Sequence, residues 1–166
     1  MKYRSVLSPF SSRPNCHPGE SGSARASALY LVDLQELQQL RLALERGILP
    51  ADFDAKLGRL AGSQLGHHFI EQHSRLFILL LLAAREGAFL EATTAQREKL
   101  LRVLAYVRKD DDAIPDPRSD GFVDDLHEVR AVSRELAPLL TAFKHWRLEH
   151  QVPVFWQSRE LAGQIH

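Results

Sequence analysis

The chain has 166 residues, of which 45% are hydrophobic and 25% are charged, values typical of one globular domain with enough apolar surface for a core. Its 21 lysines and arginines balance its 21 aspartates and glutamates, and this formal net charge of zero argues against a nucleic-acid-binding protein, which usually carries a basic excess. The single cysteine, Cys16, excludes an intrachain disulfide and a thiolate metal site built by this chain alone, and favours a reducing cytoplasm.

The first 26 residues predict a flexible N-terminal arm. Residues 1–26 are rich in proline, glycine and serine, and they offer little apolar surface to offset the entropy lost on ordering, so we expect disorder. The stretch is basic but has no continuous apolar segment, so we do not expect a secretory signal. The longest apolar run of the chain, residues 76–84, is about half of the roughly 20 residues that a membrane-spanning helix needs, and it predicts a buried core helix instead.

A helical period begins near residue 27 and continues to residue 149, which we interpret as one helical domain, residues 27–149. The first helix is expected to end at Gly47 and to bury apolar residues spaced three and four apart: Tyr30, Leu34, Leu37, Leu40 and Leu44. Helices are then expected over residues 52–61 and 64–86. The second of these is apolar around most of its second half, as is typical of a helix at the centre of a bundle.

The fourth helix is predicted to begin at Thr93 or Thr94 and to end near Lys109. Thr93 and Gln96 have the spacing of a capping box, in which each side chain satisfies the backbone N–H group of the other residue.

A fifth helix is expected over residues 122–149, with a kink or a split near Ala137, because Pro138 removes one backbone donor and clashes with the preceding turn. No strand pattern appears, so the sequence predicts an all-α fold, an irregular bundle of about five helices. Residues 150–166 form an apolar tail that we expect to pack on the bundle, with docking to a partner as the alternative.

The most unusual composition lies between the last two predicted helices, at residues 106–126. This stretch contains seven aspartates, which form the candidate functional loop: Asp110, Asp111, Asp112, Asp116, Asp120, Asp124 and Asp125. Pro115 and Pro117 cannot continue a helix, and they predict a turn. Asp120 is well placed to cap the next helix, while Asp124 and Asp125 suit the positive end of its dipole.

Three of these aspartates have no evident structural role. Asp110, Asp111 and Asp112 follow the C-terminal end of a helix, where the dipole is negative and where the three carboxylates also repel one another. Their charges require compensation by Arg108, by Arg118, by solvent, by a cation or by the basic groups of a partner.

An EF-hand calcium loop fits this segment only in part. With Asp116 at position 1, aspartate, glycine and aspartate fall at positions 5, 6 and 9, but position 3 is Arg118 and position 12, which needs a bidentate glutamate, is His127. We therefore do not expect an EF-hand. An irregular divalent-cation site remains an alternative to a solvated acidic turn, and its ligands would be Asp112, Asp116, Asp124, Asp125 and His127.

The same segment resembles the signature of the YkvA-like family of small bacterial helical domains of unknown function, which reads approximately Y-x-x-x-P-x-D-L-I-P-D-x-x-P-x-x-G-x-x-D-D-L. The matching residues are Tyr106, Asp112, Ile114, Pro115, Asp116, Gly121, Asp124, Asp125 and Leu126. The chain departs from this pattern because it lacks the first proline, carries Ala113 in place of leucine, and has a shorter stretch between Asp116 and Gly121. The resemblance covers about residues 95–135. It implies a helical hairpin around an acidic turn and implies no reaction.

A cluster of histidines offers a second candidate for chemistry, at residues 67–73. His67 and Glu71 stand four residues apart and are expected to share a helix face, whereas His73 lies elsewhere on the helix. The cluster matches neither H-E-x-x-H nor E-x-x-H, so we interpret these residues, including His68, as helix-surface side chains.

The sequence contains no glycine-rich phosphate loop, no nucleophile elbow and no cysteine with a helper histidine, so we do not expect an enzyme. We favour a cytoplasmic, bacterial protein-interaction or regulatory domain that contacts another protein, or a second copy of itself, through the acidic loop or the apolar tail. The alternative is a divalent-metal-dependent activity centred on the acidic loop. Peripheral membrane association is a third option.

Overall fold

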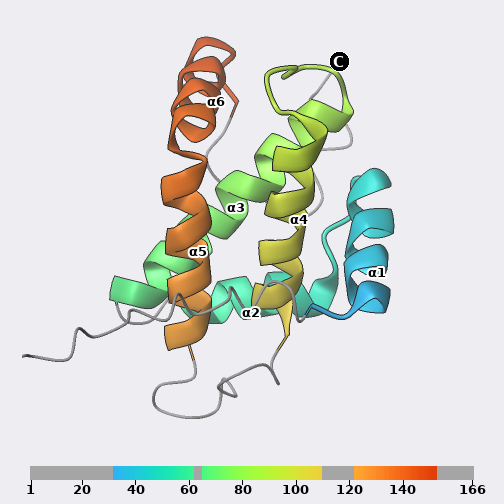
Figure 1. Cartoon of the computed structure of the whole chain (residues 1–166), viewed down its shortest axis with the longest axis vertical. Helices are drawn as coiled ribbons and strands as arrows, with labels where there is room; N and C mark the ends of the chain where they lie inside the picture. Colours follow the sequence, from blue (N-terminus) through green and yellow to red (C-terminus); the bar gives the residue numbers. More distant parts are fainter. Residues whose placement is uncertain (1–31, 62–64, 110–121, 153–166) are drawn as a thin grey trace, which may run out of the picture.

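The computed structural model describes residues 32–61, 65–109 and 122–152. Within these ranges the chain forms six helices and no strand (Figure 1). They are α1 (Leu34–Glu45), α2 (Ala51–Ala61), α3 (Leu65–Arg85), α4 (Thr94–Arg108), α5 (Val123–Glu135) and α6 (Ala137–Glu149). The predicted all-α bundle is confirmed. The predicted N-terminal arm, 1–26, and the tail beyond residue 152 lie outside the described residues.

The central helix of the bundle is α3, which packs against α1, α2, α4 and α5 (Figure 1). Its second half is buried around most of its circumference, through Leu76, Phe77, Ile78, Leu79, Leu80, Leu82, Ala83 and Ala84. Burying a large apolar side chain contributes roughly 1.5–3 kcal/mol, so this row is a main source of the stability of the fold. The expectation of a core helix at this run is confirmed, and none of the described helices combines the length and the apolarity that a membrane crossing needs.

The start of α1 corrects one part of the predicted core. The Asp33 carboxylate caps the helix by accepting a hydrogen bond from the backbone N–H of Gln35 at 2.7 Å, so Leu34 is the first helical residue. Leu34 is exposed, and its predicted place on the buried face was wrong. The core takes Val32, just before the cap, in its place. Val32 and the predicted core residue Leu37 stand at the two positions that form a hydrophobic staple around a capped helix end.

The end of α1 is closed by a residue from another helix. Gly47 has a φ of +73°, a left-handed conformation that glycine adopts without steric cost. The Arg85 guanidinium, at the end of α3, donates from Nη1 to the carbonyls of Leu44 (3.2 Å) and Glu45 (3.1 Å). These carbonyls belong to the last turn of α1, where the Leu44 carbonyl also accepts from the backbone N–H of Gly47 at 3.0 Å. Arg85 adds a donor from α3, so it joins the ends of α1 and α3.

The predicted capping box at the start of α4 is confirmed. The backbone N–H of Gln96 donates to Oγ1 of Thr93 at 3.2 Å, and the backbone N–H of Thr93 donates to Oε1 of Gln96 at 2.9 Å. Both bonds satisfy N–H groups that the first turn of a helix leaves without a partner.

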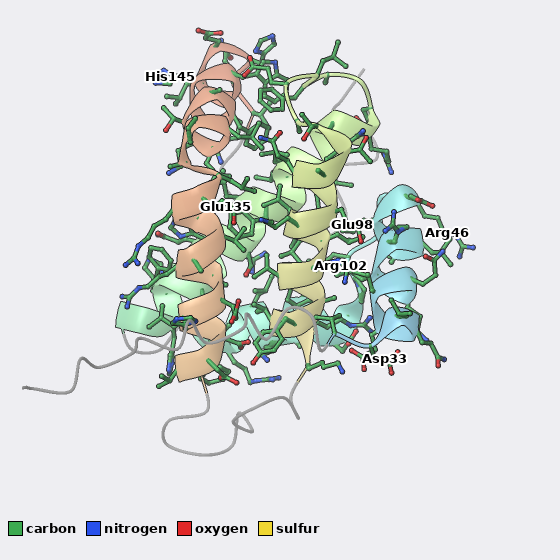
Figure 2. All side chains as sticks on the ribbon, viewed as in Figure 1. Asp33, Arg46, Glu98, Arg102, Glu135 and His145 are labelled. Atoms are coloured by element: carbon green, nitrogen blue, oxygen red, sulfur yellow. The ribbon has the colours of Figure 1, made fainter. Side chains whose placement is uncertain are left out.

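Two partly exposed ion pairs connect α4 to its neighbours. Arg41 of α1 donates to Glu98, which also forms an ion pair with Arg102, whose Nε lies 3.2 Å away, and Figure 2 shows Glu98 and Arg102 on the side of α4 that faces α1. On the other side, Lys99 donates to Glu135 of α5. Exposed pairs contribute about 0–1 kcal/mol each, so they align helices that the apolar core already holds.

The predicted break in the last long helix is also confirmed. α5 and α6 are separated by the single residue Leu136, and Pro138 lies in the first turn of α6, where a proline costs no hydrogen bond. Figure 1 shows α6 following α5 in one column. The position of α6 depends on aromatic packing, in which Phe143 contacts Phe89 at a ring distance of 5.1 Å and Trp146 at 5.5 Å.

We predict opposite effects of alanine at two glycines. Gly47→Ala is expected to lower the free energy of unfolding by about 1–2 kcal/mol, because a left-handed backbone is unfavourable for alanine and because the new Cβ would lie 3.1 Å from Arg85 Nη1. Gly58→Ala, in a helical and open position of α2, is expected to raise it by roughly 0.5–1 kcal/mol. Urea denaturation measures both changes. If both substitutions changed the free energy of unfolding in the same direction, this account of Gly47 would be contradicted.

Candidate functional site

A buried ion pair joins α2 to α5. The Lys56 ammonium lies 3.4 Å from Oδ2 of Asp125, and the two side chains are only 1% and 0% exposed. Lys56 is buried because it stands three residues after Phe53 and four before Leu60, within the apolar face of α2. A lysine at such a position has to find an acceptor, since leaving a charge buried without one costs several kcal/mol.

The Lys56 ammonium also contacts both ends of the acidic loop. It donates a hydrogen bond to the backbone carbonyl of Lys109, the residue after α4, and it lies 5.6 Å from the ring centre of Phe122, the residue before α5. Together with the pair to Asp125, these contacts form what we term the Lys56 bridge. Because the bridge touches residues on both sides of segment 110–121, it fixes the places where this segment leaves α4 and enters α5.

Asp124 has a different partner from its neighbour. Its Oδ2 accepts a hydrogen bond from the Tyr106 hydroxyl at 2.9 Å, which joins α4 to α5, and its Oδ1 accepts from the backbone N–H of Asp125 at 3.1 Å. The second bond satisfies a donor in the first turn of α5. Both aspartates lie in this first turn, at the positive end of the helix dipole where the sequence predicted them.

Arg108, one of the predicted counter-charges for the acidic loop, pairs with α2. Its Nε donates to Oδ2 of Asp52 at 2.7 Å. Burial opposes ionisation of Asp52, but the hydrogen bond and the charge of Arg108, together with backbone hydrogen bonds at Asp52 and Phe53, outweigh it, so the pKa of Asp52 lies below its ordinary value. The end of α4 is therefore joined to α2 at two points, through Arg108 and through Lys109.

The structure places only part of the predicted acidic site. Five of its aspartates lie outside the described residues: Asp110, Asp111, Asp112, Asp116 and Asp120. Asp124 and Asp125 are adjacent at the start of α5, but each contacts a different side chain of the bundle. His127 is 69% exposed, and its Nδ1 lies 3.6 Å from the carboxylate of Glu128.

The described residues do not by themselves form the predicted cation site. Among residues 32–61, 65–109 and 122–152, no three histidine, cysteine, aspartate or glutamate side chains come close enough together to hold a metal ion. The predicted set also requires Asp112 and Asp116, so the divalent-cation site stays a prediction. The capping role predicted for Asp120 also stays a prediction, because Asp120 lies outside the described part of the chain. The residue before α5 is Phe122, and its side chain makes no capping hydrogen bond.

The histidines of α3 have three different surroundings. The His67 ring contacts the edge of the Phe122 ring at 4.6 Å, whereas His68 lies 3.7 Å from Glu71 through its Nδ1. His73 stacks on Phe69 at 3.8 Å and hydrogen-bonds its carbonyl at 3.0 Å. The three imidazole rings thus contact different residues and do not converge on one point.

Glu71, expected to share a face with His67, instead accepts from Arg75 Nε at 2.5 Å. The buried Glu71 carboxylate is therefore compensated by a neighbour on the same helix.

Comparison with known proteins adds no relative: no family model, no curated protein and no solved structure matches this chain. The resemblance of residues 95–135 to the YkvA-like signature consequently rests on the residues quoted for it.

Lys56 belongs to the candidate site, and the sequence patterns did not identify it. We predict that Lys56→Met, which keeps the length of the side chain, lowers the free energy of unfolding by roughly 3–5 kcal/mol, because the buried Asp125 carboxylate then loses the Lys56 ammonium. Replacing both residues, Lys56→Met with Asp125→Leu, is expected to recover most of this loss. Chemical denaturation provides the measurement, with Arg134→Met on the exposed side of α5 as the control. A loss no larger than that of the control would refute the role of the bridge.

His73 gives a prediction about pH. Burial lowers its pKa below the ordinary value of 6.5, the charge of Lys144 acts in the same direction, and the bond to the Phe69 carbonyl opposes both. The unfolded chain therefore takes up a proton below about pH 6.5 that the folded chain resists, and the free energy of unfolding falls as the pH is lowered through this value. His73→Gln should show a smaller fall between about pH 7.5 and 5.5. If the free energy of unfolding fell equally with pH in the wild type and in His73→Gln, His73 would make no contribution to the pH dependence.

Proposed function

We propose that this chain is a non-catalytic interaction module that offers its acidic segment, residues 110–121, to a basic region of a partner protein. The observation that supports this function is the Lys56 bridge. A buried ion pair is weak evidence for stability, because desolvation of the charges offsets much of their attraction. Its effect is geometric, since it fixes the two ends of one particular segment.

The distribution of charge around the bridge supports the same function. The described carboxylates next to the segment, Asp124 and Asp125, are engaged by Tyr106 and Lys56 of the bundle itself. Between the two fixed ends, the sequence has five aspartates and one arginine. A concentrated negative charge on a fixed frame steers a positively charged partner and rejects a negatively charged one.

The proposal includes a place in the cell and a class of partner. We assign the module to a bacterial cytoplasm, in keeping with its single cysteine and with the YkvA-like resemblance. The partner is a second protein with clustered lysine or arginine. This partner differs from a second copy of the chain, whose formal net charge is zero and whose acidic segment would repel its own equivalent.

We predict that neutralising the segment removes the partner selectively. The full chain is immobilised and exposed to lysate of the native host. The test variant carries three substitutions in the segment: Asp110→Asn, Asp111→Asn and Asp112→Asn. The control variant loses the same charge from exposed sites elsewhere: Glu45→Gln, Glu91→Gln and Glu149→Gln. A basic protein retained by the wild type and the control, lost by the triple variant and released by salt, is the expected result. If the wild type, the triple variant and the control captured the same proteins, the proposal would be wrong.

Thermal denaturation with Mg²⁺, Ca²⁺ or Mn²⁺ separates this function from the metal-dependent alternative. The interaction proposal predicts no rise of the melting temperature with any of the three ions. A rise that disappears in the variant Asp116→Asn with Asp124→Asn would favour a cation site, because a ligand stabilises only the state that binds it.

A further inference from the structure

A pocket opens between α3 and α6, away from the Lys56 bridge. Its volume is about 350 Å³, within the range of about 300–1,000 Å³ typical of sites for small molecules. Residues 71–76 of α3 and residues 144–148 of α6 contribute to its walls. The residues that carry the argument are His73, Arg75 and Leu76 from α3, and Lys144, Arg147 and Leu148 from α6.

Arg147 is the unusual residue of this pocket. It stands four residues after the buried Phe143, and it is only 9% exposed. Its Nε is buried without a hydrogen-bond partner, and the guanidinium forms no ion pair with any residue of the described ranges. Burial lowers the pKa of Arg147, which means that the charged form loses part of its hydration without gaining a counter-charge.

The other charges of the pocket leave this cation uncompensated. Among the described residues, the one carboxylate in the wall is Glu71, which accepts from Arg75 at 2.5 Å, and Arg75 Nη1 also lies 3.5 Å from Asp54. Lys144 adds a second positive charge at the exposed edge, and its field contributes to the lowered pKa of His73. The pocket therefore combines a paired Glu71–Arg75 couple with an excess of positive charge at Arg147 and Lys144.

The same pocket has an apolar side. Leu76 is buried in its wall, whereas Leu148, next to Arg147 in sequence, is largely exposed. An exposed leucine beside a buried guanidinium suits a ligand with one charged end and an apolar body, because each part meets a surface of its own kind.

We propose that this pocket binds a small organic anion, whose carboxylate or phosphate group pairs with Arg147 and Lys144 and whose apolar body lies against Leu76 and Leu148. The planar guanidinium can donate two parallel hydrogen bonds to either group. Arg147 contributes the bonds that fix the head group, and Lys144 contributes attraction at the entrance. The site does not depend on the acidic segment or on its protein partner.

Isothermal titration of the full chain tests this site with three probes of equal chain length: hexanoate, hexyl phosphate and hexanol. We expect saturable one-site binding of at least one anion, and a comparison of the two anions identifies the preferred head group. Hexanol should bind at least about tenfold more weakly, because it lacks the charge-assisted hydrogen bonds. Binding of hexanol as tight as that of the anions, or no saturable binding of either anion, would overturn the proposal.

Variants locate the binding in the pocket. Arg147→Gln should weaken the anion about tenfold or more, the loss expected for a charged hydrogen-bonding group. Arg134→Gln removes the same charge from an exposed position outside the pocket and should leave the affinity within about twofold. Equal losses in the two variants would show a non-specific charge effect and would exclude the site.

Lys144→Gln gives an independent test that does not disturb the core. Lys144 is exposed, so this variant keeps the fold even if Arg147→Gln does not. Weaker binding of the anion with unchanged binding of hexanol is expected, because only the charge at the entrance is lost. An unchanged affinity for the anion would remove Lys144 from the site and would contradict the proposed arrangement.

Discussion

An ammonium group removed from water must be surrounded by acceptors, and at Lys56 this requirement sets the relative positions of three helices. The lysine belongs to α2, the carbonyl of Lys109 follows α4, and the carboxylate of Asp125 lies in the first turn of α5. Since one charged group contacts both α4 and α5, neither helix end can shift without breaking a buried interaction. The bond between Tyr106 and Asp124 restrains the same two helices from a second direction.

Much of the helical framework could be predicted because its signals are local. The capping box of Thr93 and Gln96 and the break before Pro138 depend on residues within four positions of one another, and patterns at that range are legible in a sequence. The Lys56 bridge joins groups 53 residues apart at Lys109, and farther apart at Asp125. Such contacts depend on how the helices pack, which no local pattern specifies.

The contacts of the candidate site also depend on helix packing and could not be predicted from local patterns, but the spacing of two basic residues does carry information. The sequence grouped Asp124 with Asp125, but successive residues on a helix point in different directions, and the two carboxylates meet different partners. Lys56 and Arg147 share a feature that sequence reading passed over. Each is a basic residue placed three or four positions after a buried phenylalanine, on the apolar face of its helix. A basic residue three or four positions after a buried phenylalanine therefore indicates a charge inside the bundle, and such a charge needs a compensating group from another helix or from a ligand.

Gly47 and Arg85 are structurally coupled, because the glycine leaves room for the guanidinium at the end of α1. A Cβ at position 47 would lie 3.1 Å from the Arg85 guanidinium, so the arginine would have to shift by a few tenths of an ångström from the place where it reaches the carbonyls at the end of α1. Loss of the arginine leaves those carbonyls without this donor, and loss of the glycine displaces the arginine. The junction of the first and third helices is therefore shared between two positions, one supplying the donor and the other the space, so a substitution at either one alters the same contact.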